Sequence, residues 1–145
     1  MKKAGFVCSI IVVLFALGCG AATTLVSMSI TPTAAGVIGL GDTIPVQLKA
    51  YGNFIHPTET RDISTQVTWT SNTPAVATVD NTGLVTPTGI ACGGTLITAT
   101  AGKNLIGRST ADSQAEMTAT ATFTVYSTVA GCPTPPSSMV GRSEQ

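Results

Sequence analysis

The chain has 145 residues, enough for one domain, and its seven Lys and Arg residues balance seven Asp and Glu residues. Charged residues make up only 10% of the chain and the basic ones are scattered, which excludes the clustered positive charge that nucleic-acid binding needs. Low net charge with 43% hydrophobic residues also excludes a wholly disordered chain. We therefore expect a folded domain that does not bind nucleic acid.

Residues 1–18 are expected to be a signal peptide. Lys2 and Lys3 give the chain a positively charged start, and an uncharged apolar run follows over residues 5–18. No Lys or Arg follows this run before Lys49, so the basic flank that would retain a transmembrane helix is missing. The sequence therefore predicts an exported protein.

Cleavage is expected directly before Cys19. The segment Ala16-Leu17-Gly18-Cys19 resembles the bacterial lipobox, in which the cysteine receives a diacylglyceryl group and becomes the new N-terminus. Lipid on Cys19 would anchor the protein to a membrane, with residues 19–23 as a tether. By the same resemblance, Gly20 in place of Asp implies the outer membrane in a cell that has two. The alternative is cleavage at Gly20-Ala21-Ala22, which would release a soluble secreted or periplasmic protein.

The remainder of the chain is expected to form about seven short β-strands. Runs rich in Thr and Val favour strands, and Gly, Pro and Asn punctuate them as turns do. The expected strands cover residues 25–31, 43–51, 66–70, 75–79, 84–86, 95–101 and 115–126. Because apolar and polar residues alternate within them, one face should be buried and the other exposed. We predict an all-β fold, an antiparallel β-sandwich.

The core is expected to consist of the inward-facing residues of these strands. In the strand at 43–51, Ile44, Val46 and Leu48 should share one face, although Pro45 suggests an edge or a strand start. Trp69 is expected in the core, and the alternative is a platform for stacking sugars. The predicted core residues are Trp69, Val46, Leu48, Val67, Val76, Val79, Ile97, Phe123 and Val125.

The order of these segments resembles the group 2 bacterial immunoglobulin-like domain. The resemblance is carried by LVSMSITP at 25–32, GDT at 41–43, VTWTSN at 67–72, PAVATVDNTGLV at 74–85 and GTLITA at 94–99. It covers roughly residues 24–127 and implies an immunoglobulin-like sandwich. Residues 128–145 are Pro/Ser-rich and are expected to be a disordered tail. Members of this family occur mostly in bacterial adhesins and other surface proteins, which implies a structural or adhesive role.

No catalytic, metal or cofactor site is expected. His56 is the only histidine, and no second ligand lies at the spacing of a zinc site. The acidic residues are isolated and do not form a calcium loop; they include Asp42, Asp62, Asp80, Asp112 and Glu116. Some family members are reported to bind calcium, but no residue here carries that property over. Because no nucleophile with an adjacent base is evident either, we expect a protein that is not an enzyme.

Cys92 and Cys132 are expected to form a disulfide bond. Exported proteins occupy compartments in which disulfides persist. With Cys8 in the signal peptide and Cys19 lipidated, these are the two cysteines left in the folded domain. If the strands at 95–101 and 115–126 form a hairpin, Cys92 before the first lies beside the segment that follows the second. The bridge would thus tie the end of the domain to its last hairpin.

Two functions remain open at this point. The first is that of a cell-envelope lipoprotein whose single immunoglobulin-like module has a structural or adhesive role. The alternative is a module that binds a surface glycan or an envelope protein through the loops at 52–64 and 102–114. These connections are longer than most hairpin loops, and long loops often carry binding residues.

Overall fold

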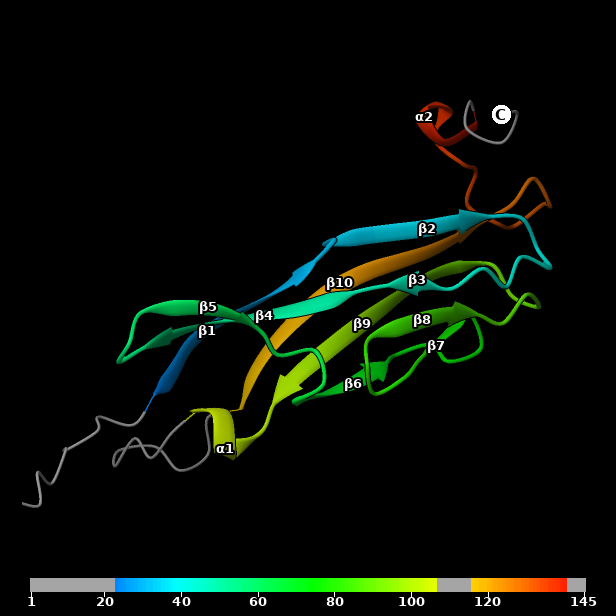
Figure 1. Cartoon of the computed structure of the whole chain (residues 1–145). Coiled ribbons are helices and arrows are strands. Elements are labelled where there is room, and N and C mark those ends of the chain that lie inside the picture. Colours follow the sequence, from blue (N-terminus) through cyan, green and yellow to red (C-terminus); the bar gives the residue numbers. More distant parts are fainter. Residues whose placement is uncertain (1–22, 107–115, 141–145) are drawn as a thin grey trace, which may run out of the picture.

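A computed structural model describes residues 23–106 and 116–140, and these residues form a two-layered β-sandwich (Figure 1). The molecule is elongated along its strands. We call the end at which β1 begins the proximal pole, and the end at which β2 and β10 finish the distal pole. The all-β, immunoglobulin-like fold expected from the sequence is confirmed.

One layer is a four-stranded sheet in the order β2-β10-β9-β6. Its strands are β2 (Ala34–Ile38), β10 (Met117–Tyr126), β9 (Gly93–Ala101) and β6 (Val67–Ser71). The two longest, β9 and β10, pair antiparallel from Met117 opposite Ala101 to Val125 opposite Gly93. Alternate residues of β10 point inward, because successive side chains of a strand lie on opposite faces.

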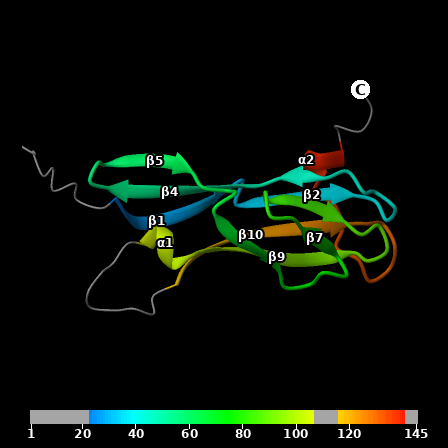
Figure 2. The same ribbon diagram turned by 60° about the horizontal axis from the view of Figure 1, so that its bottom comes forward.

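The other layer consists of two small sheets placed end to end (Figure 2). The proximal sheet has the order β1-β4-β5, with β1 (Thr24–Thr31), β4 (Lys49–Ile55) and β5 (Glu59–Asp62). The distal sheet has the order β3-β8-β7, with β3 (Val46–Gln47), β8 (Leu84–Pro87) and β7 (Ala77–Val79). Only Leu48 separates β3 from β4, so one stretch of chain joins the two sheets. Two short helices complete the described chain, α1 (Lys103–Ile106) and α2 (Ser137–Val140).

The first stretch of chain contributes to both layers. After β1, which pairs antiparallel with β4, the chain crosses over and β2 pairs in parallel with β10. The backbones approach so closely that a Cβ atom on Gly36 would lie 2.5 Å from the backbone oxygen of Thr124. Glycine is therefore required at position 36 for β2 to lie against β10.

The core lies between the layers and is apolar. Of the predicted core residues, seven are buried, namely Trp69, Leu48, Val67, Val76, Ile97, Phe123 and Val125. Val46 and Val79 are partly buried and pack against the edge of the core. Phe54, Ile63, Leu25 and Ile30 are almost fully buried as well and fill its proximal half.

Two expectations about residues 43–64 are wrong. The strand expected at 43–51 begins only at Val46, and Ile44 is 67% exposed instead of facing the core. The cause is a local turn, in which the N–H of Ile44 donates to Asp42 Oδ1 and Pro45 has no N–H to offer to a sheet. The segment expected as a loop at 52–64 is largely a β-hairpin, formed by the end of β4 and by β5.

The chain after β10 is packed beyond the boundary expected at residue 127. Ser127 is buried, and its N–H donates to the backbone oxygen of Pro133 at 3.0 Å. Cys132 is held by the disulfide described below. Residues 127–133 are therefore part of the distal pole, which differs from the expectation of disorder directly after the last strand.

Candidate functional site

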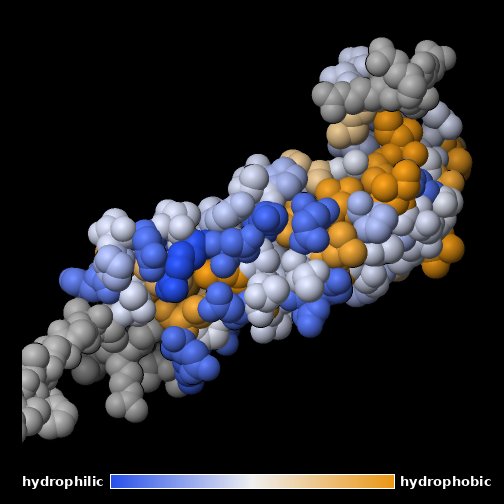
Figure 3. Space-filling view, in the orientation of Figure 1, coloured by the Kyte–Doolittle hydropathy of each residue, from blue (hydrophilic) through white to orange (hydrophobic). Residues whose placement is uncertain are grey.

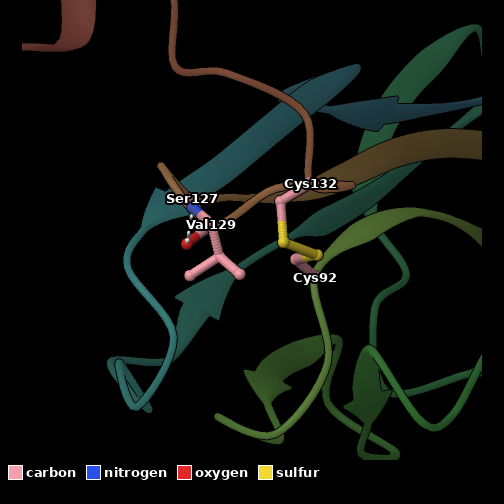
Figure 4. The surroundings of a disulfide bond; sticks show 4 residues. All are labelled: Cys92, Ser127, Val129 and Cys132. Atoms are coloured by element: carbon pink, nitrogen blue, oxygen red, sulfur yellow. Dashed lines mark hydrogen bonds between the residues drawn. A yellow bond between two sulfur atoms is a disulfide. The ribbon is translucent and has the colours of Figure 1, made fainter.

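A disulfide bond joins Cys92 and Cys132 at the distal pole (Figure 4). Cys92 directly precedes β9, and Cys132 follows β10 after a tight turn in which its N–H donates to the backbone oxygen of Val129. The antiparallel pairing places the start of β9 beside the end of β10, so the two Cα atoms are 5.6 Å apart. This is an ordinary separation for a disulfide. The predicted pairing is confirmed.

Trp69 lies in the core and is 8% exposed. Its indole Nε1–H donates to the backbone oxygen of Ser64 at 2.8 Å, which satisfies the only polar group of the ring. Gly83 packs against the indole, where a Cβ atom would lie 2.7 Å from the ring carbon Cζ2. Gly83 also has φ +85°, a conformation that favours glycine. An indole enclosed in this way has no free face on which a sugar could stack.

Ser64 is a buried polar residue that the sequence analysis did not single out. Its hydroxyl accepts the N–H of Ala50 at 2.9 Å and donates to Asp62 Oδ1 at 2.6 Å. The hydroxyl of Ser64 is the main reason that the pKa of Asp62 is lowered, and the N–H of Ser64 and the ammonium of Lys49 add to this. The serine thus joins β4, the turn after β5 and the indole of Trp69. The sequence signal was Asp62-Ile63-Ser64, a spacing at which an aspartate accepts from the chain two residues later.

A second turn is organised by Asp80, between β7 and β8. Its Oδ1 atom accepts from the hydroxyl of Thr82 at 2.7 Å and from the N–H groups of Thr82 and Leu84. The Thr82 hydroxyl lowers the pKa of Asp80 most, followed by the backbone donors of Leu84 and Thr82. Both aspartates therefore have structural roles in turns.

The β4–β5 hairpin carries half of the charged side chains in the described chain, four of eight. Lys49 Nζ lies 3.2 Å from Asp62 Oδ2, and Arg61 Nε lies 3.1 Å from Glu59 Oε1. The Arg61 guanidinium also stacks over the ring of Phe54, with its Cζ atom 4.1 Å from the ring centroid. Arg61 thus covers the core at Phe54, and each charge of the two pairs is neutralised by a neighbour.

The outward face of the proximal sheet carries a row of ordered polar groups. The amide of Asn53 donates through Nδ2 to Ser27 Oγ at 2.8 Å, and its Oδ1 accepts from the Thr60 hydroxyl at 2.6 Å. Tyr51 lies two residues earlier on the same face of β4 and is partly exposed. The row therefore combines an aromatic ring with hydrogen-bonding groups whose orientation is fixed.

Within residues 23–106 and 116–140, no three His, Cys, Asp or Glu side chains come together in a way that could hold a metal ion. His56 is exposed at the tip of the β4–β5 hairpin, where its φ is +62°. Neither described helix has the length or the apolar character needed to span a membrane. Cys19 and most of the loop at 102–114, including Asp112, lie outside the described residues.

A sandwich of this topology, closed by a disulfide, defines an immunoglobulin-like all-β module. The family model of the bacterial Ig-like domain (group 2) matches residues 26–111, which is more than half of the chain. The chain belongs to this family. No curated protein matches the chain significantly. Domains of the family are generally non-catalytic modules of surface or extracellular proteins, with a structural or adhesive role.

Proposed function

We propose that the protein is a cell-envelope lipoprotein that is anchored through Cys19 and presents one immunoglobulin-like module with a structural or adhesive role. The observation that supports this most is the placement of the chain ends: β1 begins at the proximal pole, and the disulfide lies at the distal pole (Figure 1). A chain attached at Cys19 would enter the domain from the membrane side. The distal pole would then face away from that membrane.

The Cys19 anchor can be tested by replacing Cys19 with alanine. We expect Cys19→Ala to move the protein from the membrane fraction to the soluble fraction, because the acyl chains supply the membrane affinity. Intact-mass measurement should show acyl additions on the wild type only. The matched control is Cys8→Ala, which lies in the expected signal peptide and should leave the protein on the membrane. An unmodified mature protein that begins at Thr23 would contradict the proposal and favour the rival cleavage site.

A second candidate function is glycan binding, and the polar row on the proximal sheet favours it. Aromatic rings stack on the apolar faces of sugars, and fixed amide and hydroxyl groups bind their hydroxyls. In this candidate the contacts lie on Tyr51, directly before the segment at 52–64, and on Asn53 within it.

A glycan array with the purified protein tests this candidate. If the array identifies a glycan, we expect the variant Tyr51→Ala/Asn53→Ala to bind it with an affinity at least about tenfold lower than the wild type. The control is Thr120→Ala, an exposed threonine on the outer face of β10. Glycan binding that survives the double variant, or no binding to any glycan, would rule out this face as the site.

A further inference from the structure

Five aliphatic side chains are exposed together at the distal pole. They are Ile38 (38% exposed), Leu40 (41%), Ile44 (67%), Ile90 (82%) and Val129 (54%). They belong to three segments, residues 38–45, 88–92 and 127–133, which we call the distal tip. Figure 3 shows apolar residues gathered at this pole. Clustered apolar exposure of this kind on a soluble domain marks an interaction surface.

The distal tip is held in one arrangement. The N–H of Gly41 donates to the oxygen of Gly89 at 2.9 Å, and the N–H of Gly39 donates to the oxygen of Tyr126 at 2.8 Å. The Cys92–Cys132 bridge ties segment 88–92 to segment 127–133, and Val129 lies beside it (Figure 4). The aliphatic side chains are therefore presented on a cross-linked support, and little conformational entropy remains to be lost when they are covered.

Charge is distributed unevenly between the two poles. Of the charged side chains in the described chain, only Asp42 belongs to the distal tip. The others lie on or near β4, β5, α1, the start of β10 and the β7–β8 turn: Lys49, Glu59, Arg61, Asp62, Asp80, Lys103 and Glu116. The distal tip also contains no aromatic residue. Membrane-binding surfaces combine apolar residues with Lys, Arg or interfacial Trp and Tyr, and the distal tip has none of these.

We propose that the distal tip binds the distal tip of a second copy of this chain. A surface of aliphatic side chains with a single charged residue, Asp42, is complementary to itself, and a two-fold axis brings the same patch of both copies together. The charged proximal halves remain apart in such a pair. Because β1 begins at the proximal pole, the two chains enter the dimer at its far ends (Figure 1). The inference deepens the proposed adhesive role, since two modules joined in this way would bridge two surfaces.

The oligomeric state, measured by analytical sedimentation, tests the proposal. The protein used is the full exported chain with Cys19→Ala, because without acyl chains it needs no detergent. We expect a monomer–dimer equilibrium with a dissociation constant below about 1 mM, as small interfaces show. Ile44→Asp/Ile90→Asp should weaken it at least about tenfold. These side chains are mostly exposed, so folding should be retained, as checked by circular dichroism and disulfide mapping. The matched control is Val26→Asp, an exposed valine on β1 at the proximal pole.

Three outcomes would overturn the inference. They are a monomer at every concentration, a dimer that the tip variant does not weaken, and tip-dependent binding to neutral phosphatidylcholine vesicles by a protein that stays monomeric.

Aggregation of cells that display the protein separates this inference from the proposed function. Cells that aggregate equally with wild-type and tip-variant protein would keep the adhesive role and remove the tip contact. A tip-dependent dimer of the purified protein that does not aggregate cells would keep the tip contact and remove the adhesive role.

Discussion

Replacing Trp69 with alanine is expected to lower the free energy of unfolding by about 3–5 kcal/mol. The indole is buried between the layers, and its removal leaves a cavity next to Gly83 as well as an unpaired oxygen on Ser64. A domain of this size has about 5–15 kcal/mol of stability, so the variant should be close to unfolding. Urea unfolding followed by circular dichroism measures the loss.

Trp69→Phe is the control for this prediction. It keeps an aromatic ring in the core but removes the N–H that donates to Ser64, so we expect a smaller loss of about 1–3 kcal/mol. A Trp69→Ala variant with an unchanged unfolding midpoint would show that the indole does not contribute to the core. Loss of a glycan ligand with no change in stability would return Trp69 to a binding role.

Removing the disulfide with Cys92→Ser/Cys132→Ser is expected to lower the free energy of unfolding by about 3–4 kcal/mol. The bridge closes a loop with a sequence separation of 40 residues, and an open loop gives the unfolded chain more conformations. Thermal unfolding measures the effect. The circular dichroism of the variant should retain its β-type spectrum, because β9 and β10 pair through nine residue positions of their own.

Peptide mapping without reduction provides the direct check on the bridge. One linked peptide pair containing Cys92 and Cys132 is expected in protein isolated from its native envelope. Two thiols that alkylate freely in that protein would contradict the pairing. Both cysteines are replaced together in the stability experiment because a single substitution would leave a reactive thiol.

The strands that could be predicted are those whose own residues alternate. In β6, β9 and β10, apolar and polar positions follow each other with a period of two, and the face expected to be buried is buried. The disulfide could be predicted for a related reason, since an antiparallel hairpin fixes which flanking positions meet. In these cases the alternation within each strand and the pairing of two strands that follow one another in the sequence are sufficient.

The strands that could not be predicted depend on a distant partner. The sequence of β2, AAGVI, has no alternation, and it is a strand because β10 offers an edge about ninety residues later in the chain. The sequence of β5, ETRD, is wholly polar and forms a strand only by pairing with β4. At Ile44 the alternation of apolar and polar residues was misleading. It predicts a strand from residue 43, but a turn held by Asp42 delays the start of the strand to Val46. The exposed aliphatic residues of the distal tip likewise carry no local signal, since three separate segments bring them together.

The parallel pairing of β2 with β10 determines how the module would respond to a pulling force. Traction on the two chain ends would draw β2 and β10 in opposite directions along their common axis, because the chain enters at one pole and leaves at the other. The hydrogen bonds between parallel strands are evenly spaced and slanted between the two strands, so each of them resists this sliding. They would bear the load together, whereas strands pulled apart from one end break their bonds one at a time. The crossing of the first segment from one layer to the other is therefore also a mechanical clamp.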